Sequence, residues 1–132
     1  MTGELGATLR EFHEAFHVEP NVYFDEYDID PDLIRRQHML QEEVNELLLA
    51  ILEGDRVAAA DALGDVIYIA AGTADLAGIP IDEVLHAIHA ANMRKLGPDG
   101  KPVPHATVPG KIGKPEGWVG PEAEIRKILV RS

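Results

Sequence analysis

The 132-residue chain contains no cysteine, one tryptophan and few basic residues. Without cysteine it can form neither disulfides nor thiolate metal sites, and it has no cysteine nucleophile. The net charge of −11 at pH 7 argues against a nucleic-acid-binding surface. No window resembles a signal peptide, and no apolar run approaches membrane-spanning length, since Asp75 interrupts the longest candidate. We therefore expect a soluble, cytoplasmic protein with no membrane or nucleic-acid partner.

The length predicts a single domain, residues 1–132, with a modest core that burial against a second copy would enlarge. Charge is unevenly distributed along it. Residues 1–96 carry 19 acidic and 6 basic residues, whereas residues 97–132 carry 4 acidic and 6 basic residues. An acidic body that acts on an anionic ligand needs bound cations to hold that ligand.

Apolar periodicity predicts an all-α fold, an antiparallel helical bundle. The expected helices span residues 4–17, 31–53, 55–77, 82–96 and 122–131. The second helix is the best delimited, with Asp30 as N-cap, Pro31 at the first position and Gly54 as the stop. Its expected buried stripe consists of Leu33, Leu40, Val44, Leu47, Leu48 and Ile51. The short connection to the third helix makes the two antiparallel neighbours.

Five carboxylates fall on these two helices at a similar distance from the turn. Glu42, Glu43 and Glu46 precede it, and Asp61 and Asp65 follow it. Like charges at such spacings repel, and aspartate is a poor helix-interior residue. One interpretation is a solvated acidic face. The other is a shared cation, for which hard oxygen ligands favour Mg²⁺ or Mn²⁺.

Two histidine pairs stand at helical spacing: His13 with His17, and His86 with His89. The first spacing suits zinc, but no third ligand is evident and no HExxH motif occurs, so a zinc hydrolase is disfavoured. The second pair also lacks obvious partners, so a solvated or interfacial role is expected for it rather than a ligand role. Phe12 and Phe16 are either core aromatics or a stacking surface for a base.

The segment 97–121 holds six of the nine prolines and six of the twelve glycines. It cannot be a helix, and so long a loop is typical of a lid, a wrap around a partner, or disorder. Trp118 indicates that the loop docks somewhere. Because the loop contains Lys111 and Lys114, we expect it to act as a lid that adds positive charge. A short C-terminal helix, 122–131, follows.

Three ordered motifs carry a resemblance to a known family. They are EExxE from Glu42, a second helix with GD before an apolar run (DALGDVIYIAAG), and NMxK from Asn92, followed by DGKP and GKIGKPEGW. Over about residues 8–120 the chain resembles the MazG-like all-α NTP pyrophosphatases, especially short members of the phosphoribosyl-ATP pyrophosphohydrolase-like and dUTPase-like kinds. EExxE alone is a weak signal, whereas the ordered set is fairly specific.

The resemblance implies a helical bundle completed by dimerisation, with a dimer of dimers as a variant. It also implies Mg²⁺-dependent cleavage of a nucleoside triphosphate, such as dUTP, into the monophosphate and pyrophosphate, with Mn²⁺ as an alternative ion. By motif, the implied metal ligands are Glu43, Glu46 and Asp65, and Asp61 is the candidate to replace the family's usual acid as a fourth ligand. Glu42 would bind a second metal, support the metal ligands or act as the base that orients water, and Lys95 is the other catalytic candidate. Candidates for binding the substrate are Asn92, Lys95, Lys111, Lys114, Tyr68, Phe16 and Gln41.

The chain departs from the family at one position. The family usually has an acid three residues before the second aspartate, where this chain has Ala62, although Asp61 is adjacent and on the side of Asp65. The substitution puts metal number, substrate choice or activity in doubt. It also supports an alternative function, a non-catalytic helical dimer that binds nucleotides or regulates a partner.

Overall fold

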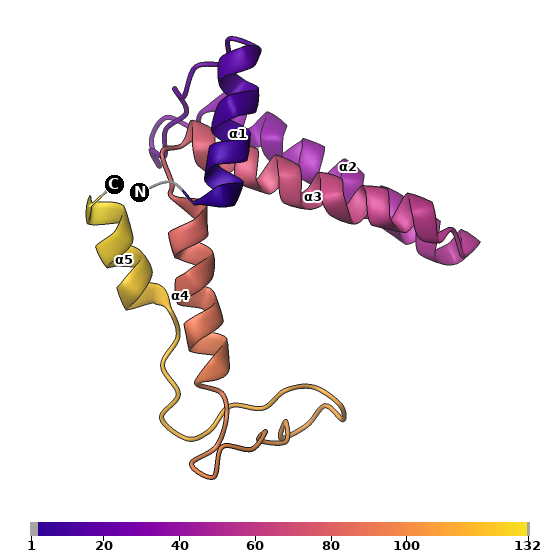
Figure 1. Ribbon diagram of the computed structural model, residues 1–132, viewed down its shortest axis with the longest axis vertical. Helices are drawn as coiled ribbons and strands as arrows, with labels where there is room; N and C mark the ends of the chain where they lie inside the picture. Colours follow the sequence, from indigo (N-terminus) through magenta and orange to yellow (C-terminus); the bar gives the residue numbers. More distant parts are fainter. Residues whose placement is uncertain (1–2, 132) are drawn as a thin grey trace. The chain divides into compact units, whose positions relative to one another are not determined.

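The computed structural model describes residues 3–131, and within that range it contains five α-helices and no strand (Figure 1). Contacts divide the chain into two compact units after Ile81. The first unit contains α1 (Glu4–Ala15), α2 (Pro31–Glu53) and α3 (Arg56–Leu76). The second contains α4, which spans Ile81–Met93, and α5, which spans Glu122–Arg131. The predicted all-α fold is confirmed.

Both ends of α2 follow from local sequence signals. Asp30 accepts a hydrogen bond from Asp32 N at 2.9 Å through one carboxylate oxygen and from Tyr23 N at 3.1 Å through the other. Pro31, which has no amide hydrogen to satisfy, opens the helix. Gly54 closes it with φ of 65°, a left-handed conformation that costs glycine little. The predicted bounds of α2 are confirmed.

Helices α2 and α3 run antiparallel and side by side (Figure 1). Asp55 caps α3 by accepting a hydrogen bond from Ala58 N at 3.0 Å. Only Gly54 and Asp55 separate the two helices, and so short a connection favours antiparallel neighbours. Small residues dominate the interior of the first unit, which lets the helices approach closely. The buried apolar residues of its three helices are Leu9, Ala50, Ala62, Ala71, Ala74 and Leu76.

Polar side chains attach α1 to α3. His13 is only 2 % exposed, and its Nδ1 lies 2.6 Å from Asp75 Oδ2. Arg10 reaches the same carboxylate oxygen at 3.7 Å. Helix α1 ends at Ala15, two residues earlier than predicted, because the chain turns there and His17 adopts a left-handed φ of 56°.

The interior of the first unit is closed around Gly72. A Cβ added there would lie 2.8 Å from the Arg36 guanidinium and 3.3 Å from Leu9, so a larger residue would have to displace the Arg36 side chain. Arg36 comes from α2, is 9 % exposed, and donates from Nε to Thr73 Oγ1 at 2.7 Å. Three helices therefore meet where α3 has no side chain.

The predicted buried stripe of α2 is largely wrong for the single chain. Leu33, Leu40 and Leu47 are half-buried, whereas Val44, Leu48 and Ile51 are 46–62 % exposed. The only fully buried residues of α2 are Arg36 and Ala50. The stripe is left open because α2 has strong contacts with α3 alone.

Helix α3 is long and apolar enough, by length and composition, to cross a membrane, with a mean hydropathy of 1.3. The expectation that no run approaches such a length is therefore wrong for this helix. The reason is that α3 is rich in alanine and an 18-residue window of it holds no more than two charged residues.

In the second unit, α4 ends at Met93, three residues before its predicted end. Leu96 pairs with Pro102 in an isolated bridge, which takes the chain out of the helix before Gly97. A second bridge joins Pro104 to Ile112 within the segment 97–121. Helix α5 begins at Glu122 and ends at Arg131, as predicted, and buries Ile128.

A candidate carboxylate site on α2 and α3

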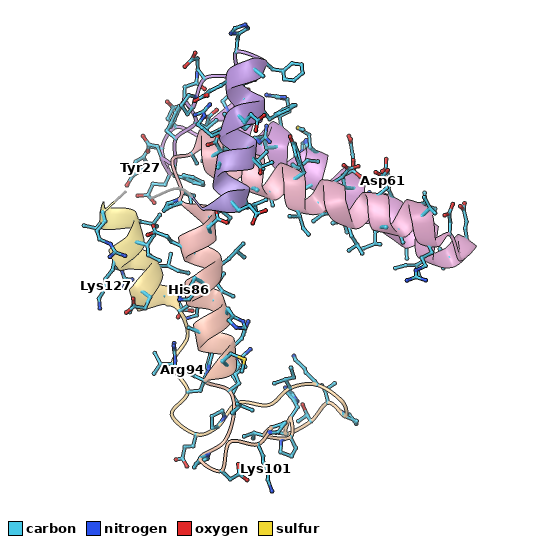
Figure 2. The ribbon with its side chains drawn as sticks, viewed as in Figure 1. Tyr27, Asp61, His86, Arg94, Lys101 and Lys127 are labelled. Atoms are coloured by element: carbon cyan, nitrogen blue, oxygen red, sulfur yellow. The ribbon has the colours of Figure 1, made fainter. Side chains whose placement is uncertain are left out.

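Three of the predicted carboxylates, on α2 and α3, act on a fourth, Glu43. The pKa of Glu43 is raised from 4.5 to about 7, first by a hydrogen bond with Glu46 and then by desolvation. The negative charges of Glu46, Asp65 and Asp61 raise it further. Asp61 lies on the outer surface of α3 (Figure 2). Glu43 is thus the focus of the predicted cluster.

The carboxylate cluster has donor atoms that suit a divalent cation, but its side chains are not gathered around one point. As the side chains stand, no group of three or more His, Asp or Glu among residues 3–131 is gathered closely enough to hold a metal ion. However, Oε2 of Glu43 is buried and has no hydrogen-bond partner. A buried carboxylate oxygen without a partner, on a residue whose pKa is raised by three other acids, fits a hard cation in the chemistry of its donors. Rotation of these side chains would be needed to complete a coordination shell.

Glu42 and Ala62 stand apart from this group. Glu42 is exposed, and its charge is not among the causes of the raised pKa of Glu43. Ala62 is 2 % exposed, so an acid at this position would be buried in the interior of the first unit. The neighbouring Asp61 is exposed and contributes the smallest of the charge effects on Glu43.

Three aromatic rings gather on α1 and α3. The centroid of Phe12 lies 4.8 Å from that of Phe16 and 5.5 Å from that of Tyr68. These rings are not core residues, because Phe12 and Tyr68 are each 38 % exposed and Phe16 is 67 % exposed. Tyr68 follows Asp65 by three residues and so shares its side of α3. The cluster offers exposed ring faces on the same helix as the acids.

The remaining predicted residues of the first unit have other contacts. Gln41 is exposed and donates to Asn45 Oδ1 at 3.1 Å along α2. The Nδ1 of His13 is engaged by Asp75, and His17 is exposed, so the zinc interpretation of this pair gains no support. His86 and His89 are both exposed, and Figure 2 shows His86 on α4.

Three surface hollows have volumes of about 530, 300 and 580 Å³. They lie beside residues 23–34, beside residues 10–20 and on α5. None of these three is lined by a predicted site residue. Glu42, Glu46 and Asp61 are exposed and Glu43 and Asp65 are partly exposed, so the carboxylates lie on an open surface of the single chain.

The predicted cationic residues belong to the second unit. Asn92 lies in the last turn of α4, whereas Lys95, which the predicted helix 82–96 included, lies beyond its end. Lys95 and Lys114 both lie over the ring of Trp118, with Nζ 5.2 and 4.7 Å from its centroid. Lys111 is exposed and makes no such ring contact.

The buried polar contacts of the first unit were not predicted from the sequence. Arg36 with Thr73 and His13 with Asp75 each join two helices. One signal was available: Asp75 and His13 both fall on otherwise apolar helix faces. A buried acid needs a polar partner, and His13 is a histidine on another helix that could supply one. No comparable signal pointed to Arg36.

Comparison with known proteins gave two findings. The family profile of phosphoribosyl-ATP pyrophosphohydrolase matches residues 9–92, which include the carboxylate cluster and Asn92. A similar solved structure is a candidate NTP pyrophosphohydrolase from Exiguobacterium sp. 255-15, with 23 % sequence identity and a TM-score of 0.53. The match covers 99 % of this chain and 96 % of that one, and at this identity it shows a shared fold. Comparison with curated protein sequences gave no match.

The family profile covers more than half of the chain, over the region in which α2 and α3 place four acids near one another. The motif order that first indicated the MazG-like superfamily lies largely in the same range. The chain therefore belongs to the phosphoribosyl-ATP pyrophosphohydrolase family of MazG-like NTP pyrophosphatases, and it is a pyrophosphohydrolase.

Proposed function

We propose that the chain hydrolyses a nucleoside triphosphate between its α and β phosphates, and that Mg²⁺ is bound by Glu43, Glu46, Asp61 and Asp65. The observation that carries this proposal is Glu43, whose pKa of about 7 and unpartnered Oε2 mark an acid crowded by other acids. Such crowding is costly unless a cation relieves it. Mn²⁺ satisfies the same oxygen chemistry.

The substrate brings about four negative charges toward these carboxylates, which requires intervening cations. A bound divalent ion would lower the pKa of an attacking water and offset the charge of the leaving pyrophosphate. Glu42 is free on the exposed side of α2 to orient that water or accept its proton. Lys95 and Asn92 are the donors proposed to bind phosphate oxygens.

For the base, we propose the aromatic cluster of Phe12, Phe16 and Tyr68. Its rings are partly exposed and would stack on a nucleobase. A deoxynucleotide such as dUTP is the proposed substrate, with phosphoribosyl-ATP, which names the family, as a competitor. Gln41, paired only with Asn45, is a candidate donor to the base edge.

We also propose that the protein is a cytoplasmic homodimer, with a dimer of dimers as a variant. The exposed apolar residues of α2 and α3, such as Leu48, Leu52 and Ile67, support a second copy as the partner. Contact with a membrane would place Asp61 and Asp65 against hydrocarbon, which is unfavourable. A second copy would also cover the carboxylate surface, which is open in the single chain.

The proposal is tested by pyrophosphate release from a panel that includes dUTP, dCTP and phosphoribosyl-ATP, with Mg²⁺ or Mn²⁺. Glu46→Gln and Asp65→Asn should lower turnover by about 100-fold or more, because each removes a proposed metal ligand. Glu53→Gln, an equal charge change at the far end of α2, is the matched control. Calorimetric titration with Mn²⁺ should show weaker binding for the two site variants only.

A second candidate function is a nucleotide-binding module without catalysis. Ala62 favours it, since the position that usually bears an acid is buried here and Asp61 is exposed. If no nucleotide in the panel is hydrolysed with either ion while calorimetry still detects nucleotide binding, this second function replaces the first.

A further inference from the structure

The only tryptophan of the chain gathers two lysines that are far apart in sequence. The Nζ of Lys95, just past the end of α4, lies 5.2 Å from the ring centroid of Trp118. The Nζ of Lys114, in the segment 97–121, lies 4.7 Å from the same centroid. All three residues belong to the second unit.

The ring is anchored on α4. Trp118 is half-buried, and its Nε1 donates to the carbonyl oxygen of Ala91 at 2.8 Å. The next residue, Val119, accepts a hydrogen bond from Arg94 at 3.4 Å. The indole is therefore anchored to α4 through its own Nε1, and the residue after it is bonded to the turn that follows α4, so the ring is a platform against which both lysines rest.

The two ammonium groups lack a local counter-charge. Among residues 3–131, neither Nζ forms an ion pair with a carboxylate, although the chain has a net charge of −11. The negative face of the indole attracts both, whereas the lysines repel each other. A ligand that carries several negative charges would satisfy both ammonium groups at once.

We infer that Trp118 is a positioning residue that presents Lys95 and Lys114 as a joint site for a di- or triphosphate anion. The inference rests on the proposed function and deepens it, because it assigns Lys114, in preference to Lys111, to the phosphate chain. Lys114 is the loop lysine held at the ring, and Lys111 makes no ring contact. The indole acts through the lysines and does not touch phosphate.

The site is tested on the full chain with inorganic pyrophosphate in EDTA, so that metal binding by the carboxylates does not contribute. Lys114→Met should weaken calorimetric affinity for pyrophosphate about tenfold, as expected for loss of one charge-assisted contact. Lys114→Arg should retain most of the affinity. Lys101→Met is the matched control, since Lys101 is an exposed lysine of the same segment without ring contact, and its affinity should be unchanged. Pyrophosphate should also change the fluorescence of Trp118.

Trp118→Phe tests the positioning role, because it keeps an aromatic ring but removes the donor to Ala91 and weakens the attraction for the lysines. Pyrophosphate affinity should fall about threefold, and KM for the triphosphate should rise more than kcat falls. A lower melting temperature with unchanged affinity would mean that Trp118 only anchors the segment, which overturns the inference.

Failure of this inference can be separated from failure of the proposed function. If nucleotides are hydrolysed but Lys114→Met and Lys101→Met bind pyrophosphate equally well, the two-lysine site is wrong and the enzymatic proposal stands. If no nucleotide is hydrolysed but pyrophosphate binding depends on Lys114, the site stands and the enzymatic proposal is wrong.

Discussion

Glu43 holds a proton at a pH where an isolated glutamate is ionised. Its pKa is raised to about 7 by a hydrogen bond with Glu46, by desolvation and by neighbouring negative charge. Between pH 4.5 and 7 the folded state therefore binds more protons at this group than the unfolded state does. The contribution of Glu43 to the free energy of unfolding must fall as the pH rises through this range.

We predict that Glu43→Gln abolishes this pH dependence. In EDTA, the melting temperature of the wild type relative to that of the variant should decline from pH 4.5 to pH 7, because glutamine cannot ionise. Thermal unfolding of both proteins across this range is the measurement. Added Mn²⁺ should offset the decline in the wild type, since a cation replaces the proton. Parallel curves for the two proteins in EDTA would contradict the prediction.

At the residue scale, the sequence predicted which acids lie on one helix side but not the environment of each acid. The acids were identified from spacing, since i, i+3 and i, i+4 positions share a helix side regardless of the fold. Their individual environments were not predictable in this way. That Ala62 is buried while Asp61 is exposed depends on how α3 rests against α2, and that packing is fixed by contacts distant in sequence.

At the scale of elements, helix boundaries were predicted best where the cap is local. Asp30, Pro31 and Gly54 bound α2 by their own chemistry, and Asp55 starts α3. The end of α4 was predicted three residues too late, because it depends on the pairing of Leu96 with Pro102. This pairing forms only when the following segment folds back, so the local sequence of the helix contains no signal for it.

The segment 97–121 has a glycine that controls its course. Gly113 is buried and donates from its amide to Val103 O at 2.8 Å, and a Cβ there would meet the carbonyl oxygens of Val103 and Pro104. We predict that Gly113→Ala displaces the segment and releases Trp118 from α4. Fluorescence emission should shift to the red with helix content by circular dichroism unchanged. Gly110→Ala is no suitable control, since Gly110 has a φ of 78°, so Ala106→Gly, an exposed change in the same segment, is used.

An emission maximum that stays in place in Gly113→Ala would show that the docking of Trp118 does not depend on this tight turn. A loss of helix content would show that the segment also supports α4 or α5.

At the scale of the whole molecule, most of the large apolar side chains are on the outside. Leu48, Leu49, Ile51, Leu52 and Val57 are all more than half exposed, whereas the buried set consists mainly of alanine. Apolar burial within one chain is therefore small, and a chain that buries so little is marginally stable alone. The sequence predicted a buried stripe on α2, but Val44, Leu48 and Ile51 of that stripe are exposed in the single chain.

We predict that stability depends on assembly. The melting temperature of the wild type should rise with protein concentration, because association stabilises the folded state by mass action. Leu48→Lys and Ile67→Lys should give monomers by light scattering, with a melting temperature independent of concentration. Both side chains are exposed in the single chain, so neither change should disturb its fold directly. Val108→Lys, an exposed apolar position in the segment 97–121, is the control.

A wild type that remains monomeric at all concentrations, with a constant melting temperature, would contradict assembly through this surface.

The absence of a side chain at Gly72 also affects the surface of the first unit. Guanidinium, leucine and imidazole groups from two other helices occupy the space that a Cβ would fill. A larger residue there would press on the Arg36 guanidinium and on Leu9 and His13 of α1. Because α1 also carries Phe12, whose ring lies against Tyr68 of α3, packing at this buried position bears on the contact that brings the surface rings together.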